Sequence, residues 1–261
     1  MPNIRMYGAA PFTVAVIHGG PGAPGTMAPV ARELAREWGV LEPLQTADTL
    51  DGQVEELRAA LEEHAALPVA LIGSSWGAML GVILAGRYPA LIRKLILVGS
   101  GVYEQRYATH ITPVRLARLS ENERQQIELL EPLLADPTTP DKNRIMGQLG
   151  DFFTKADAYD PLTLDTELIE AQYQINQHVW ADAVALRESG ELLAIAGRIA
   201  CPVVAIHGDY DPHPPEGIRD VLAPILKDFR FILLPHCGHL PWIEREARDA
   251  FYDLLRRELQ T

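Results

Sequence analysis

The chain has 261 residues, of which 48% are hydrophobic and 22% charged, and its formal net charge is −12. This length suits one large domain, or a core domain that carries an inserted subdomain. The negative charge argues against nucleic acids and anionic membrane surfaces as partners, because phosphates are bound by Lys and Arg. No apolar run approaches the roughly 20 residues that span a bilayer, and residues 1–8 lack the apolar segment of a signal peptide. We therefore expect a cytoplasmic protein.

The first hundred residues alternate short apolar runs with stretches of helical periodicity. Residues 13–17 are apolar and β-branched and precede glycines, as expected of a strand buried on both faces. Strands are also expected at 40–44, 69–72 and 95–98, and helices at 26–38, 50–65 and 78–88. This β-α-β rhythm predicts a mostly parallel sheet with helices on both faces.

The alternation then stops. Residues 103–196 contain helical periods but no convincing strand, whereas strands resume at 202–206 and 229–234 and a helix is expected at 244–259. A helical block is thus inserted between two parts of one sheet.

These elements predict an α/β fold with a mostly parallel central sheet, helices on both faces and an inserted helical cap. The core is expected from residues 1–102 and 197–261, and the cap from residues 103–196. The two cysteines, Cys201 and Cys237, make neither a C-x-x-C pair nor a zinc-ligand spacing, which favours a reducing compartment.

Residues 73–77, Gly-Ser-Ser-Trp-Gly, form a G-x-S-x-G motif between an expected strand and an expected helix. In that context the motif is typical of a nucleophile elbow, a turn so sharp that glycine is needed two residues to either side of the nucleophile. The N-terminus of the following helix also favours developing negative charge. The motif predicts Ser75 as a nucleophile; the alternative is a glycine-rich turn without catalysis.

A serine hydroxyl needs a base to take its proton and an acid to orient the base. Candidates follow the last two expected strands, at the edge where open α/β sheets hold reactive groups. Asp209 and Asp211 compete for the role of acid, and His236 and His239 for the role of base.

Residues 18–22, His-Gly-Gly-Pro-Gly, follow the first buried strand. An oxyanion needs two N–H donors, one from the residue after the nucleophile, here Trp76, and one from an early loop. Pro21 has no N–H, and we expect Gly20 rather than Gly19 to be the second donor. The loop has neither a Walker A lysine nor a G-x-G-x-x-G pattern, which argues against nucleotide binding.

Together, the three motifs resemble the α/β-hydrolase superfamily over nearly the whole chain. The loop at 18–22 with Trp76 after the nucleophile is similar to the prolyl aminopeptidase (proline iminopeptidase) branch. Members of that branch release an N-terminal residue from peptides and place a helical cap over the active site.

The resemblance also implies which acid and base are used. The family's chain order is Ser, acid, His. Gly208-x-x-Asp211 with Pro215 looks like the family's acid loop, which favours Asp211. A Gly-His pair before a C-terminal helix is the family's arrangement, which favours His239.

We therefore predict a serine hydrolase of small esters or amides, an aminopeptidase or a carboxylesterase, with Ser75, Asp211 and His239 as triad and no metal or organic cofactor. The partner is a small-molecule or peptide substrate, and the sequence does not indicate an oligomeric state. A ligand receptor on the same scaffold and a carbon–carbon bond hydrolase are the alternatives. In an aminopeptidase, acidic cap residues such as Glu167, Glu170 or Asp182 would anchor the substrate ammonium; the alternative is a solvated acidic surface.

Overall fold

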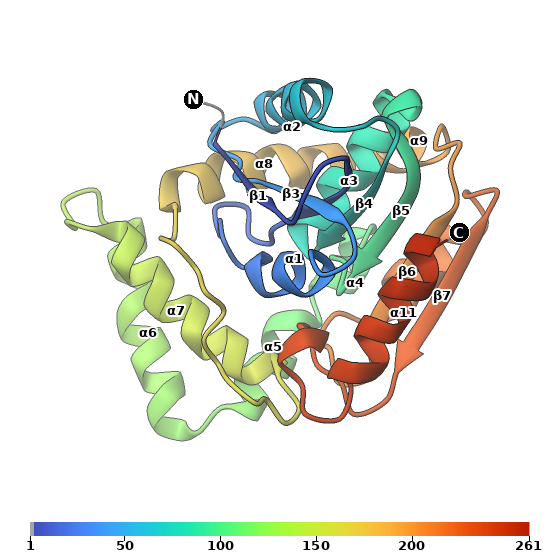
Figure 1. Ribbon diagram of the computed structural model, residues 1–261. Coiled ribbons are helices and arrows are strands. Elements are labelled where there is room, and N and C mark those ends of the chain that lie inside the picture. Colours follow the sequence, from blue (N-terminus) through green and yellow to red (C-terminus); the bar gives the residue numbers. More distant parts are fainter. Residues whose placement is uncertain (1–2, 261) are drawn as a thin grey trace.

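The computed structural model describes residues 3–260, which form a seven-stranded sheet with helices packed on both faces (Figure 1). The strands lie in the order β1-β3-β2-β4-β5-β6-β7, and all neighbours are parallel except β1 and β3. The predicted fold class is therefore confirmed. The strands are β1 (Ile4–Tyr7), β2 (Phe12–Ile17), β3 (Gly39–Pro43), β4 (Val69–Ser74), β5 (Ile92–Val98), β6 (Val203–Gly208) and β7 (Phe229–Leu234).

Eleven α-helices and two short 3₁₀ turns connect and cover these strands within residues 3–260. No helix in this range combines the length and the apolar surface that a bilayer crossing requires. The helices and turns are α1 (Ala28–Leu34), α2 (Leu50–His64), α3 (Trp76–Arg87), η1 (Pro89–Leu91), α4 (Gln105–Ala108), α5 (Ile111–Arg118), α6 (Glu121–Ala135), α7 (Lys142–Asp157), α8 (Tyr173–Glu188), α9 (Glu191–Ala196), α10 (Glu216–Leu222), η2 (Pro241–Ile243) and α11 (Arg248–Gln260).

The strand side chains divide the core into two layers. Along β2, Val14 and Val16 belong to a buried cluster with α1 and α11, whereas Ala15 and Ile17 belong to a cluster with α2 and α3. Successive side chains of a strand point to opposite faces, so a strand covered on both sides must be apolar throughout. This is why the central strands read as uninterrupted apolar runs in the sequence.

The sequence prediction missed β1. This four-residue strand lies at the edge of the sheet, pairs with β3, and contains the exposed residue Met6. With only four residues, one of them the charged Arg5, this edge strand lacks the apolar run that identified the central strands.

Helices α4 to α9 connect β5 to β6, across the range expected to form the cap. Helices α5, α6 and α7 share an apolar cluster of their own, and α6 and α7 lie side by side away from the sheet (Figure 1). By contrast, Val179 and Ala183 of α8 and Leu192 of α9 belong to the same buried cluster as the strands. The division of the chain at residues 103 and 196 stays a prediction.

Candidate active site

The predicted site residues follow the carboxyl ends of four parallel strands. Gly20 comes after β2, Ser75 directly after β4, Asp211 after β6 and His239 after β7. Because parallel strands present their carboxyl ends at one edge of the sheet, these loops meet there. Gly20, Ser75 and His239 line one cavity of about 320 Å³.

Ser75 occupies a strained backbone position between β4 and α3. Its φ is 53° and its ψ is −114°, a conformation that non-glycine residues rarely adopt. A Cβ added at Gly73 would lie 2.1 Å from the carbonyl oxygen of Gly77, and a Cβ at Gly77 would lie 2.4 Å from that of Ile17. Both glycines are therefore required by the close backbone approach, which is the geometry of a nucleophile elbow.

Asp211 and His239 form a buried hydrogen-bonded pair. His239 donates through Nδ1–H to Asp211 Oδ2 at 2.7 Å, and its backbone N–H donates to the Asp157 carbonyl at 3.0 Å. Burial acts against protonation of His239, but the Asp211 carboxylate raises the pKa of the imidazole above its usual 6.5. Because Nδ1 holds the proton that points to Asp211, Nε2 is left as the basic nitrogen.

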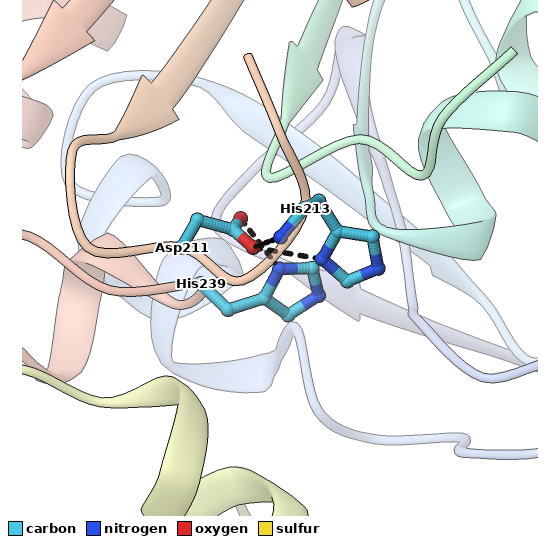
Figure 2. A group of neighbouring side chains, drawn as sticks. All are labelled: Asp211, His213 and His239. Carbon is cyan, nitrogen blue, oxygen red and sulfur yellow. Dashed lines mark hydrogen bonds and ion pairs between the residues drawn. The ribbon is translucent and has the colours of Figure 1, made fainter. Parts of the chain in front are cut away.

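A second histidine, His213, shares the same carboxylate (Figure 2). Its Nδ1–H and its backbone N–H both donate to Asp211 Oδ1, at 2.7 and 2.9 Å, and its ring stacks on that of His239 with centroids 4.7 Å apart. Although burial acts in the opposite direction, His239, His207 and His213 hold the pKa of Asp211 well below its usual range. The sequence analysis missed His213; its signal is the position two residues after the acid, in Asp-Pro-His.

The ligand atoms of Asp211, His213 and His239 lie within 4.8 Å of one another, which suits a metal ion by distance alone. The hydrogen bonds suit it less, because each imidazole turns an N–H, not a lone pair, toward the carboxylate. The three side chains are therefore arranged as a hydrogen-bonded network and not as a set of metal ligands.

The competing acid and base make other contacts. The Asp209 carboxylate accepts the backbone N–H of Cys237 at 3.1 Å, which braces the loop after β7. His236 is exposed and its Nδ1 lies 2.6 Å from the Glu246 carboxylate. Ser75 lines two cavities, and neither Asp209 nor His236 lies on the wall of either one.

The loop at residues 18–22 is held by a buried neutral histidine. His18 donates through Nδ1–H to the carbonyl of Gly19 at 2.8 Å, so Nε2 is free to accept the backbone N–H of Gln45 at 3.3 Å. Complete burial lowers the pKa of His18 from 6.5 to about 4. Within residues 3–260, the backbone N–H groups of Gly20 and Trp76 donate no hydrogen bond; Gly20 lines the 320 Å³ cavity, whereas Trp76 does not.

Two cavities meet at Ser75. The cavity of about 320 Å³ is lined by His239 and by residues of α7, and a second of about 490 Å³ lies toward α5 and α8. Ser75, Gly20 and Arg115 line both of them. The arrangement can hold a substrate on either side of the serine.

None of the three acidic cap residues suggested as amine anchors lines either cavity. Glu167 forms an ion pair with Arg32, Glu170 accepts a hydrogen bond from Asn143, and Asp182 accepts the backbone N–H of Leu50. Their positions favour the alternative interpretation, a solvated acidic surface.

Known proteins share the sequence pattern at low identity. A pimeloyl-[acyl-carrier protein] methyl ester esterase of Nitrosomonas europaea is 24% identical over 75% of this chain and 72% of its own length. A 2-hydroxy-6-oxononadienedioate/2-hydroxy-6-oxononatrienedioate hydrolase of Cupriavidus pinatubonensis is 25% identical over 94% of this chain and 85% of its own length.

A solved proline iminopeptidase of Mycobacterium smegmatis superposes with a TM-score of 0.63 at 18% identity, covering 98% of this chain and 93% of that one. At this identity the likeness concerns the fold, so the narrower prolyl aminopeptidase resemblance stays a prediction. Residues 14–254 match the description "Alpha/beta hydrolase family". By this match over most of its length, the chain belongs to the alpha/beta hydrolase family.

Proposed function

We propose that the protein is a serine hydrolase that cleaves small esters or amides through an acyl-enzyme on Ser75. The observation that carries the proposal is the 2.7 Å hydrogen bond between Asp211 and His239, beside a strained serine that shares a cavity with His239. A histidine with a fixed tautomer and a raised pKa is suited to general-base catalysis.

In the first step, His239 Nε2 takes the proton of the Ser75 hydroxyl as the oxygen attacks the substrate carbonyl. Asp211 holds the imidazole in this tautomer and stabilises its protonated form. The N–H groups of Gly20 and Trp76 bind the oxyanion, and loss of one such donor costs about 3–4 kcal/mol of transition-state stabilisation.

In the second step, His239 gives its proton to the leaving alcohol or amine. It then takes a proton from the water that attacks the acyl-enzyme, and gives that proton to the Ser75 oxygen as the acid product leaves. The residues need neither a metal ion nor an organic cofactor for this chemistry.

Carboxylesterase activity requires only these residues and a cavity on each side of Ser75. Aminopeptidase activity also requires a carboxylate for the substrate ammonium. The observation that favours this second candidate is Asp151, an exposed carboxylate that lines the 320 Å³ cavity. Asp157 lines the same cavity but is bound by Arg115.

The test compares p-nitrophenyl acyl esters with aminoacyl p-nitroanilides, including the prolyl one. Ser75→Ala is expected to lower kcat by about 10⁴-fold or more, whereas Ser189→Ala, an exposed serine on the loop after α8, is the matched control. Anilide cleavage that requires Asp151 would establish the aminopeptidase, and ester cleavage alone the carboxylesterase. Turnover that survives Ser75→Ala would overturn the proposed nucleophile, and tight binding of a substrate without turnover would favour the receptor alternative.

A further inference from the structure

Arg187, on the last turn of α8, is a buried cation without a counter-ion. Its side chain is 92% buried (8% exposed) and its Nε has no hydrogen-bond partner. Within residues 3–260 the one hydrogen bond of its side chain is a long one, 3.4 Å from Nη1 to the carbonyl of Val102, and the side chain forms no ion pair. Burial lowers the pKa of Arg187 more than the neighbouring carboxylate of Glu188 raises it, yet arginine stays protonated in proteins. A charge held this way is costly unless a partner arrives.

The guanidinium lies at the cavity of the proposed nucleophile. Arg187 and Ser75 both line the 490 Å³ cavity. The guanidinium carbon is 5.8 Å from the centroid of the Trp180 ring, and that ring is in edge contact with Trp76, the residue after the serine. Arg187 is thus separated from the elbow by one aromatic side chain.

The cavity offers Arg187 no negative charge. Among the described residues that line it, none is Asp or Glu. The other arginine on its wall, Arg115, is neutralised by a two-point contact with Asp157, at 2.8 and 2.5 Å. The cavity therefore carries one uncompensated positive charge, and it is that of Arg187.

We propose that Arg187 binds a carboxylate of the substrate, so that the enzyme is selective for esters or amides that carry a carboxylate remote from the scissile carbonyl. The free Nε–H belongs to the edge of the guanidinium that pairs with two carboxylate oxygens. A carboxylate in this cavity would supply the counter-ion that Arg187 lacks, with the scissile bond at Ser75 on the same cavity wall. The inference rests on the proposed serine hydrolase activity and names its substrate class.

The experiment compares charged and neutral substrates of equal size. Monomethyl esters of dicarboxylic acids from succinate to suberate are compared with methyl esters in which an isopropyl group replaces the carboxylate. A second pair, 4-acetoxybenzoate and 4-acetoxybenzamide, places the charge on the leaving group. We expect kcat/KM to favour the anion by about tenfold or more in one of the two series.

Variants then test whether the preference comes from Arg187. Arg187→Met should abolish the anionic-to-neutral ratio, and Arg187→Lys should retain part of it. The matched control is Arg198→Met, which removes the same charge from an exposed position and should keep the ratio. Because the readout is a ratio, a general loss of activity does not imitate the effect.

A third measurement needs no variant. Glutarate should inhibit hydrolysis of a neutral ester competitively, and its diamide should inhibit at least about tenfold more weakly. Equal treatment of anionic and neutral substrates in both series, or a preference that survives Arg187→Met, would overturn the assignment. Failure of the serine hydrolase proposal is seen separately, as ester turnover that persists in Ser75→Ala.

Discussion

His213 and His239 stack with their ring centroids 4.7 Å apart and donate to opposite oxygens of one carboxylate, that of Asp211. Each oxygen of the carboxylate thus accepts a hydrogen bond from a different imidazole. His239 is the one that lines the smaller cavity with Ser75, whereas His213 faces the larger. We therefore expect His213 to act as a positioning residue, which fixes the proposed acid that orients the proposed base.

Replacing His213 should change how strongly Asp211 acts on His239. In His213→Leu the carboxylate loses the Nδ1–H donor but keeps the backbone N–H of residue 213, so its negative charge acts more fully on His239 and raises that pKa further. The acid limb of the kcat/KM profile should move to higher pH, and stability should fall by about 1.5–3 kcal/mol because a buried charged acceptor loses one of its donors. The control is His178→Gln, on an exposed side chain. An unchanged acid limb would contradict the positioning role.

The pH dependence of the wild type follows from His239. The proposed base works only when neutral, and its pKa is raised above 6.5, so kcat/KM should fall as the pH drops through that raised value. Asp211→Asn removes the charge that raises it, which should shift the limb to lower pH and lower kcat by about 10⁴-fold. Asp209→Asn affects only the hydrogen bond to the backbone of Cys237, so it should leave kcat and the pH of the acid limb unchanged. A larger loss of kcat in Asp209→Asn than in Asp211→Asn would instead make Asp209 the acid.

Much of the fold could be predicted because the central strands are buried on both faces, as β4 is along its whole length. Burial on both sides demands apolar runs, and the turns after them carry the polar residues. Ser75, Asp211 and His239 could be selected from strand-end positions and motif resemblance alone, although their catalytic roles stay predictions.

Other parts of the site depend on contacts that no local pattern records. His213 matters because its ring meets His239, which is distant in the sequence. Arg187 is one of many charged residues along the helical block, and only its burial beside Trp180 sets it apart. The acidic residues of this block suggested either an anchor for a substrate ammonium or a solvated surface, whereas the cavity wall carries an unpaired cation.

His18 should make the protein less stable in mild acid. Unfolded His18 takes up a proton as the pH falls through 6.5, whereas the folded residue stays neutral until about 4. In that window the unfolded state binds more protons, so stability falls by about 2 kcal/mol between about pH 7 and about pH 5. In His18→Gln this contribution should vanish, whereas His178→Gln should retain it. Urea unfolding at each pH measures the effect, and equal slopes in wild type and His18→Gln would refute it.

The ion pair between Arg115 and Asp157 should stabilise the folded protein and also affect the pKa of His239. Asp157 is 4% exposed, and its carbonyl accepts the backbone N–H of His239. Arg115→Met leaves that carboxylate buried and unpaired, which should cost about 3–5 kcal/mol of unfolding free energy. It should also move the acid limb to higher pH, because Asp157 raises the pKa of His239 and Arg115 lowers it.

A double variant separates the pair from the individual side chains. Arg115→Met combined with Asp157→Asn removes both charges, so it should recover part of the stability lost in Arg115→Met and return the acid limb toward that of the wild type. Arg144→Met, which breaks a surface pair with Asp141 at 3.7 Å, should change stability by less than about 1 kcal/mol. Urea unfolding and the pH profile of kcat/KM measure the two effects. Additive losses in the double variant would show that the two charges act independently of each other.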